Sequence, residues 1–269
     1  MNCHLVTDSH RSLFRDKGVR RVFVSASTRC FSDKSFNDAC FQLDDLEYDK
    51  VELWMSEAAG HLQLSEVVGD PERFYNRFRE TTRLAPIAFC LENDPDVPSF
   101  RALSRLAKQL RVTQITIPAS RLGTPFNAEI DRLKALLEIG TQDGILLSIK
   151  TRIGHLTEDP NTAVELCQAT PGLGITLDPS CYTCGPHKHI SHDHVYPYVY
   201  HVHLRDTSAT QFQVSIGLGE IDYSRVISQL HRVKYLRALS VELWPELMVE
   251  GEDRAIELRK MRLLLESLL

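Results

Sequence analysis

Short runs of aliphatic and β-branched residues alternate with longer amphipathic stretches along the chain. Eight runs predict strands, at residues 22–25, 51–54, 87–91, 114–118, 145–150, 174–178, 200–204 and 239–243. The stretches between them predict helices, at residues 36–46, 71–83, 99–109, 128–137, 160–169, 194–200, 223–233 and 252–269. Alternating strands and helices indicate a parallel sheet with helical crossovers. Eight such units predict closure into a single (β/α)₈ barrel, with an open doubly wound sheet as the alternative.

Local signals support these boundaries. Pro71 falls in a first helical turn, and Asp159 and Asp222 stand where N-caps are expected. We expect residues 1–18 to form an N-terminal tail or extension and residues 19–269 to form the barrel. The glycines Gly217 and Gly219 come too late in the chain to be a dinucleotide-binding fingerprint.

Composition narrows the class of protein. The 269 residues are 43% hydrophobic and 25% charged, enough for one domain with a sizeable core. The net charge of −5 gives no general attraction for nucleic acid, and no apolar run is long enough to cross a membrane. Seven scattered cysteines are typical of reduced thiols, so we expect a cytoplasmic protein. The sequence leaves the oligomeric state open, with a homo-oligomer as one option.

Polar residues gather on one face of the last four predicted strands. Reading every second residue joins Ser148 to Lys150, Thr176 to Asp178, His201 to His203 and Ser240 to Glu242. In a closed barrel this face points inward, where ionisable groups need partners. We therefore expect Lys150, Asp178, His203 and Glu242 to meet at the C-terminal end of the barrel, where barrel active sites lie. A buried ion-pair network without catalysis is the alternative.

At these residues the chain resembles the xylose isomerase-like TIM barrels, a family with sugar phosphate isomerases and epimerases. The matching stretches are residues 51–53, 174–180, 201–206, 217–223 and 239–242, and the likeness runs from about residue 20 to the end. Each stretch is short, but their order and spacing together are specific. The resemblance implies an isomerase or epimerase of a small sugar, sugar phosphate or keto-polyol, acting by proton transfer beside a carbonyl.

The same resemblance implies a divalent metal (Mn, Mg, Co or Zn), held by a Glu on strand five, an Asp on strand six, a His on strand seven and a Glu on strand eight. Asp178, His203 and Glu242 match, but Lys150 stands in place of the strand-five Glu. Either Lys150 replaces the cation and no metal binds, or a metal stays on the other three with Lys150 turned to the substrate. Repulsion between an ammonium and a metal favours the first.

Several residues are candidates for catalysis or substrate binding. Lys150 could act as a base or form a Schiff base if its pKa were lowered, with Glu242 as its acid/base partner. Cys181 lies three residues after Asp178, where the family often has His, and Arg152 and Arg205 are candidate clamps for an anion. The full set of substrate-binding candidates is Glu52, Trp54, Glu92, Arg152, Cys181 and Arg205.

The loop over residues 181–194 is rich in cysteine and histidine. This loop carries Cys181, Cys184, His187, His189, His192 and His194, which predicts either a zinc site or a mobile lid.

The functional alternatives are a lyase or dehydratase that uses the same enolate, and a metal-free binding or sensor protein on the same barrel. The net charge and the missing strand-five Glu disfavour an abasic-site endonuclease.

Overall fold

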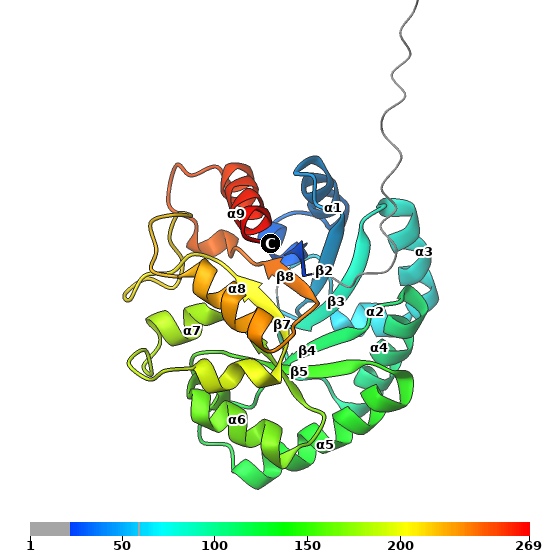
Figure 1. The fold of residues 1–269 in the computed structure, drawn as a ribbon. Helices are drawn as coiled ribbons and strands as arrows, with labels where there is room; N and C mark the ends of the chain where they lie inside the picture. The colour runs from blue at the N-terminus through cyan, green and yellow to red at the C-terminus, as the bar shows by residue number, and fades with distance from the viewer. Residues whose placement is uncertain (1–21, 59) are drawn as a thin grey trace, which may run out of the picture.

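Eight parallel strands close into a barrel, each paired with its neighbours in chain order (Figure 1). The computed structural model describes residues 22–269 except residue 59. The strands are β1 (Phe23–Ser27), β2 (Lys50–Met55), β3 (Ala85–Leu91), β4 (Gln114–Pro118), β5 (Leu146–Lys150), β6 (Gly174–Leu177), β7 (Val199–Leu204) and β8 (Ala238–Val241). The predicted (β/α)₈ barrel is confirmed, and the open sheet is excluded because β8 pairs with β1.

Helices surround the barrel (Figure 1). They are α1 (Phe36–Asp45), α2 (Leu64–Gly69), α3 (Pro71–Thr81), α4 (Val97–Leu110), α5 (Phe126–Asp143), α6 (Pro160–Ala169), α7 (Pro179–Cys184), α8 (Tyr223–Arg232) and α9 (Arg254–Leu268). The described chain also has four short 3₁₀ segments, η1 (Thr28–Phe31), η2 (Leu156–Glu158), η3 (Asp193–Tyr198) and η4 (Pro245–Leu247); η1, η2 and η4 follow β1, β5 and β8, and η3 lies between α7 and β7. The pattern did not predict α2 and α7, because six residues are too few to show a helical period.

One predicted helix is wrong. Residues 194–200 were expected to be helical, but the segment forms the 3₁₀ turn η3, and β7 already begins at Val199. Pro197 lies inside the turn and lacks the N–H that an α-helix would need there. The tail predicted for residues 1–18 lies outside the described residues.

Aspartate caps explain where several helices begin. Asp70 accepts from the backbone N–H of Arg73 at 3.0 Å, directly before Pro71 at the first position of α3. Asp159 and Asp222 cap α6 and α8 in the same way, as the sequence predicted. Each cap satisfies an N–H that has no partner inside the helix, and such a cap contributes about 1 kcal/mol.

The hydrophobic core lies between the barrel and its helices. Alternate strand residues such as Ile149, Leu177, Val202 and Val241 are fully buried in it. Their polar neighbours along each strand face the barrel interior instead, where side chains of different strands bond one another. The period of two therefore separates an apolar layer from a polar barrel lumen.

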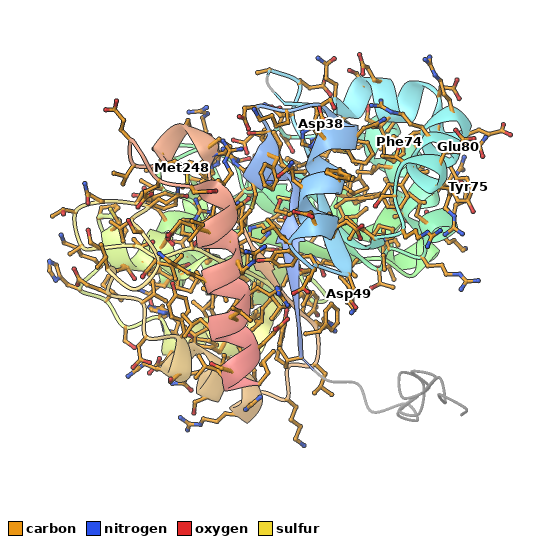
Figure 2. The ribbon with its side chains drawn as sticks, turned by 90° about the horizontal axis from the view of Figure 1, so that it is seen from above. Asp38, Asp49, Phe74, Tyr75, Glu80 and Met248 are labelled. Carbon is orange, nitrogen blue, oxygen red and sulfur yellow. The ribbon has the colours of Figure 1, made fainter. Side chains whose placement is uncertain are left out.

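The C-terminal helix closes the ring beside the first elements of the chain (Figure 1). Tyr48 donates its hydroxyl to the carbonyl of Leu258 at 2.9 Å, and Arg262 pairs with Glu47 at 2.5 Å. Figure 2 shows Met248, which comes after β8, toward one end of the barrel and Asp49, which precedes β2, toward the other. The first of these ends carries the segments that follow the strands.

None of the helices in the described part of the chain combines the length and the apolar character needed to cross a membrane.

Candidate functional site

The deepest polar layer of the barrel consists of hydroxyl and amide groups. Ser25 and Ser240 bond through their hydroxyls at 2.7 Å across the β1–β8 pair. On the opposite side Thr176 bonds Thr116 at 2.7 Å and Ser148 at 2.6 Å. These contacts join neutral groups to one another, so this layer is structural.

Above it, one carboxylate holds two histidines. Both His201 and His203 place Nε2 2.7 Å from the same oxygen of Glu52, and all three side chains are buried. Because a carboxylate only accepts, both Nε2 atoms carry hydrogen. Burial would raise the pKa of Glu52, but His203 and the hydrogen bond from His201 lower it overall. Glu52 thus fixes the orientation of the two rings, and its own side chain is inaccessible to solvent.

The next layer contains the ion pair between Lys150 and Glu242. The Lys150 ammonium lies 2.7 and 2.6 Å from the two carboxylate oxygens of Glu242. Burial works against both charges, yet the pair holds the pKa of Lys150 above its usual value and that of Glu242 well below. The raised pKa of Lys150 argues against its use as a basic amine or Schiff-base lysine.

A second cation completes this cluster. Arg205 donates Nη2 to Asp178 at 2.8 Å and also to Glu242, and all three side chains are fully buried. Its guanidinium lies over the rings of Phe212 and Trp244, with centroids at 4.7 and 4.6 Å. If Lys150 alone replaced the cation, it would have to neutralise both Asp178 and Glu242, but Asp178 has Arg205 as its partner instead.

Arg29 and two tryptophans cover this cluster. Arg29, in η1 after β1, lies over the rings of Trp54 and Trp244, at 4.7 and 3.9 Å. It donates to Glu92 at 2.5 Å, and the Trp54 indole donates to the same Glu92 oxygen at 3.2 Å. Arg29 was not predicted, although it follows the first strand just as the recognised residues follow theirs.

A pocket of about 1050 Å³ opens above this cover, at the C-terminal end of the barrel. Arg29, Trp54, Glu92, Arg152 and His155 are among the residues that line it. Three predicted substrate-binding residues thus meet here, and Arg152 pairs with Glu92 at 2.6 Å. Lys150 is 7% exposed, whereas Asp178, His203, Arg205 and Glu242 are 0% exposed, so in the buried charge cluster only the lysine reaches solvent.

His155 lines the same pocket. Its Nδ1 lies 2.6 Å from the carbonyl of Ala119, which can only accept, so Nδ1 donates. Burial lowers the pKa of His155, which keeps the ring neutral at pH 7 with a lone pair on Nε2.

The residues do not fit a divalent metal on Asp178, His203 and Glu242. Oxygens of both carboxylates are already bound by Lys150 or Arg205, and a metal would stand beside these two cations. A different group, Glu52, Cys90, His203 and Glu242, brings four potential ligand atoms within 4.8 Å of one another. It shares Glu242 with Lys150, so the same repulsion applies.

Other sequence candidates lie apart from the pocket. Cys181 is 1% exposed, and its thiol donates to the carbonyl of Thr151 at 3.0 Å. Arg205 has internal carboxylate partners, and Glu52 is engaged by histidines, so neither is placed to contact a ligand directly. In the loop over residues 181–194, His187 approaches Glu158 at 3.6 Å. Among the described residues, no group of metal-ligating side chains includes this loop.

The glycine pair after β7 has a structural role. The backbone N–H groups of Gly217 and Gly219 donate to one oxygen of Asp206, at 2.8 and 3.1 Å. A Cβ on Gly219 would stand 2.0 Å from the other Asp206 oxygen. These amides therefore bind a carboxylate of the protein itself, and none of this geometry is that of a phosphate loop.

Comparisons with known proteins agree with this architecture. Three solved structures superpose over 91% of this chain: a xylose isomerase-like TIM barrel protein from Mycobacterium smegmatis in complex with magnesium (TM-score 0.71, 15% identity, 97% of that chain), an L-ribulose 3-epimerase (0.68, 15%, 95%) and the probable 3-DHS dehydratase of petrobactin synthesis from Bacillus anthracis (0.68, 16%, 98%). At these identities the likeness concerns the fold. A search of curated protein sequences gave no match. The family model for the xylose isomerase-like TIM barrel matches residues 47–264, and the chain belongs to this family.

Proposed function

We propose that the protein is a metal-independent isomerase or epimerase of a small carbonyl carbohydrate, with the Lys150 ammonium as its electrophile. The observation that carries this proposal is the pairing of Lys150 with both oxygens of Glu242, at 2.7 and 2.6 Å, with the lysine the less completely buried of the two, at 7% against 0% exposed. The sugar epimerases among its structural neighbours support the substrate class.

In this proposal Lys150 stabilises the oxyanion of an enediolate. Removal of the proton beside a carbonyl places negative charge on the carbonyl oxygen, and a fixed ammonium close to that oxygen lowers the barrier. Glu242 keeps the Lys150 ammonium in place, and Arg205 offsets part of the negative charge of the carboxylates around it. Glu242 itself is a poor base, because the cations around it hold its pKa far below the ordinary range.

His155 is the proposed proton acceptor. It is neutral at pH 7, lines the pocket, and has its tautomer fixed by the bond to Ala119. Its Nε2 would take the proton from the carbon beside the carbonyl. Delivery of that proton to the neighbouring carbon, while the hydroxyl proton of the enediol moves between its two oxygens, would give the isomer; protonation of the same carbon on its opposite face would give the epimer. If the His155 proton exchanges with solvent first, a solvent proton returns to carbon. Lys150 would donate a hydrogen bond throughout and stay protonated.

Solvent exchange at carbon tests the proposal without knowledge of the product. L-ribulose, D-psicose and D-tagatose, sugars named for its structural neighbours, and their phosphate esters would be incubated in D₂O and followed by NMR. We expect deuterium beside the carbonyl of at least one of them, and a loss of about 10²–10³-fold in rate in Lys150→Met. Wild-type protein treated with chelator should exchange at an unchanged rate.

Lys134→Met is the matched control, because Lys134 is exposed on α5 away from the pocket lining. Its rate should equal that of the wild type. Equal rates in Lys150→Met and the wild type, on a sugar that the wild type exchanges, would refute the role of Lys150.

A binding or sensor protein is the second candidate. The specific observation in its favour is that Arg205 binds both Asp178 and Glu242 beneath the cover of Arg29 and Trp244. Saturable binding of a sugar without any exchange of its protons would favour this candidate.

A further inference from the structure

The Glu92 carboxylate occupies a point on which donors from three strand ends converge. Arg29, after β1, donates to one Glu92 oxygen at 2.5 Å, and Trp54, near the end of β2, donates to the same oxygen at 3.2 Å. Arg152, after β5, donates to the other oxygen at 2.6 Å. All four residues line the pocket, and the Glu92 side chain is 18% exposed.

Each guanidinium group has a contact other than the Glu92 carboxylate. Arg29 is fixed between the rings of Trp54 and Trp244, and its other terminal nitrogen lies 3.2 Å from the exposed Glu246. Arg152 also donates to the backbone carbonyl of Glu92, at 3.4 Å. Two arginines held in this way form a preorganised anion receptor, and Glu92 occupies it from within the chain.

We propose that the ligand of this pocket is an anion, whose carboxylate or phosphate group replaces the Glu92 side chain between Arg29 and Arg152. This inference deepens the proposed function and rests on the same pocket. Glu92 acts as an internal competitor, so ligand binding costs the energy of breaking its ion pairs. The positive charge of Lys150 also helps to lower the pKa of Glu92, so an anion in the place of the Glu92 carboxylate would be attracted by this ammonium as well.

Calorimetric titration with inorganic phosphate and with acetate tests the exchange, with D-fructose as an uncharged probe. Glu92→Gln removes the competing charge and keeps the shape of the side chain. We expect it to bind phosphate or acetate about tenfold more tightly than the wild type, at low ionic strength. The anion with the larger gain identifies the group that the receptor prefers. Arg152→Met added to Glu92→Gln should cancel the gain.

Asp94→Asn is the matched control. Asp94 lines the same pocket and is paired with Arg132, so its replacement makes the pocket more positive by the same unit without freeing Arg29 or Arg152. We expect little change in its anion affinity. Equal gains in the two variants would show a general charge effect, and no gain in Glu92→Gln would mean that the receptor does not exist. Either result, or a gain for D-fructose alone, overturns the inference.

Folding and function are kept separate in this test. Each variant is checked by its thermal unfolding. If Glu92→Gln is unstable, Glu92→Asp takes its place; it withdraws the carboxylate by one methylene and should give a smaller gain in anion affinity. Because binding is measured without turnover, a failed exchange experiment with Lys150→Met would refute the proposed chemistry and leave the anion receptor standing. Failure of the phosphate and acetate titrations would refute the anion receptor and leave the proposed chemistry of Lys150 standing.

Discussion

The Lys150 ammonium donates to both carboxylate oxygens of Glu242 across the barrel, although 92 positions separate the two residues in the chain. Lysine thereby supplies the positive charge at a centre where the family resemblance implies a metal ion. Arg205, which directly follows β7, adds a second positive charge. The cluster thus balances its carboxylates with groups that belong to the chain.

The stability of this pair can be measured by urea unfolding of Lys150→Met, Glu242→Gln and the double variant. Glu242→Gln should cost about 3–5 kcal/mol, because it leaves two buried cations short of a partner. Lys150→Met should cost less, since Arg205 still pairs with Glu242. The two effects should be non-additive by about 0.5–3 kcal/mol. Lys108→Met, which removes a 3.9 Å surface pair with Asp143, should change stability by less than about 1 kcal/mol.

Restoring a carboxylate on β5 should create a metal site. In Lys150→Glu, three carboxylates and His203 would face one remaining guanidinium, so we expect Mn²⁺ to stabilise this variant by about 2–3 kcal/mol at a hundredfold excess over its dissociation constant. Wild-type protein should show no such shift in its melting temperature. Lys150→Gln, which removes the ammonium without adding a carboxylate, is the control. A wild type that gains as much as Lys150→Glu would contradict the reasoning.

The pH profile of proton exchange should show the titration of His155. Burial lowers the pKa of His155 below its ordinary value of 6.5. The imidazole is therefore neutral at pH 7 and becomes protonated only as the pH falls through this lowered pKa. The rate should therefore hold near neutrality and decline in acid. His155→Gln should lower the rate about 10²–10⁴-fold and abolish that decline. An unchanged acid limb in this variant would assign the titration to another group.

Gly219 should tolerate no side chain. In Gly219→Ala the new Cβ would meet Asp206 at 2.0 Å and the backbone nitrogen of Thr207 at 2.7 Å, so we expect a loss of about 1–3 kcal/mol in unfolding free energy. Gly69→Ala is the matched control, since a Cβ there would meet nothing within 4 Å. Comparable losses in the two variants would mean that the Asp206 contact is not what constrains Gly219.

The barrel was predictable from sequence because its signals are local. A period of two in the strands places Ile149 and Leu177 in the core and turns Ser148 and Thr176 inward, whatever the rest of the chain does. The caps at Asp159 and Asp222 act over three residues or fewer. The helix predicted at residues 194–200 failed because the segment is short and a proline interrupts it.

The candidate site was predictable only in part. Strand-end position brought Lys150, Asp178, His203 and Glu242 to one end of the barrel, as expected from sequence. Partner choice was not predictable, because it depends on side-chain reach across the barrel.

What the sequence determined by itself is the alternation of apolar and polar positions, and with it the number of strands and the polar lining of the barrel. What only the tertiary structure decided is which charges meet. Closure of β8 onto β1 carries Glu242 to Lys150 and brings Arg29 over both tryptophans. Coulomb energy depends on distances between side chains that are remote in the chain, and these distances exist only once the ring is closed.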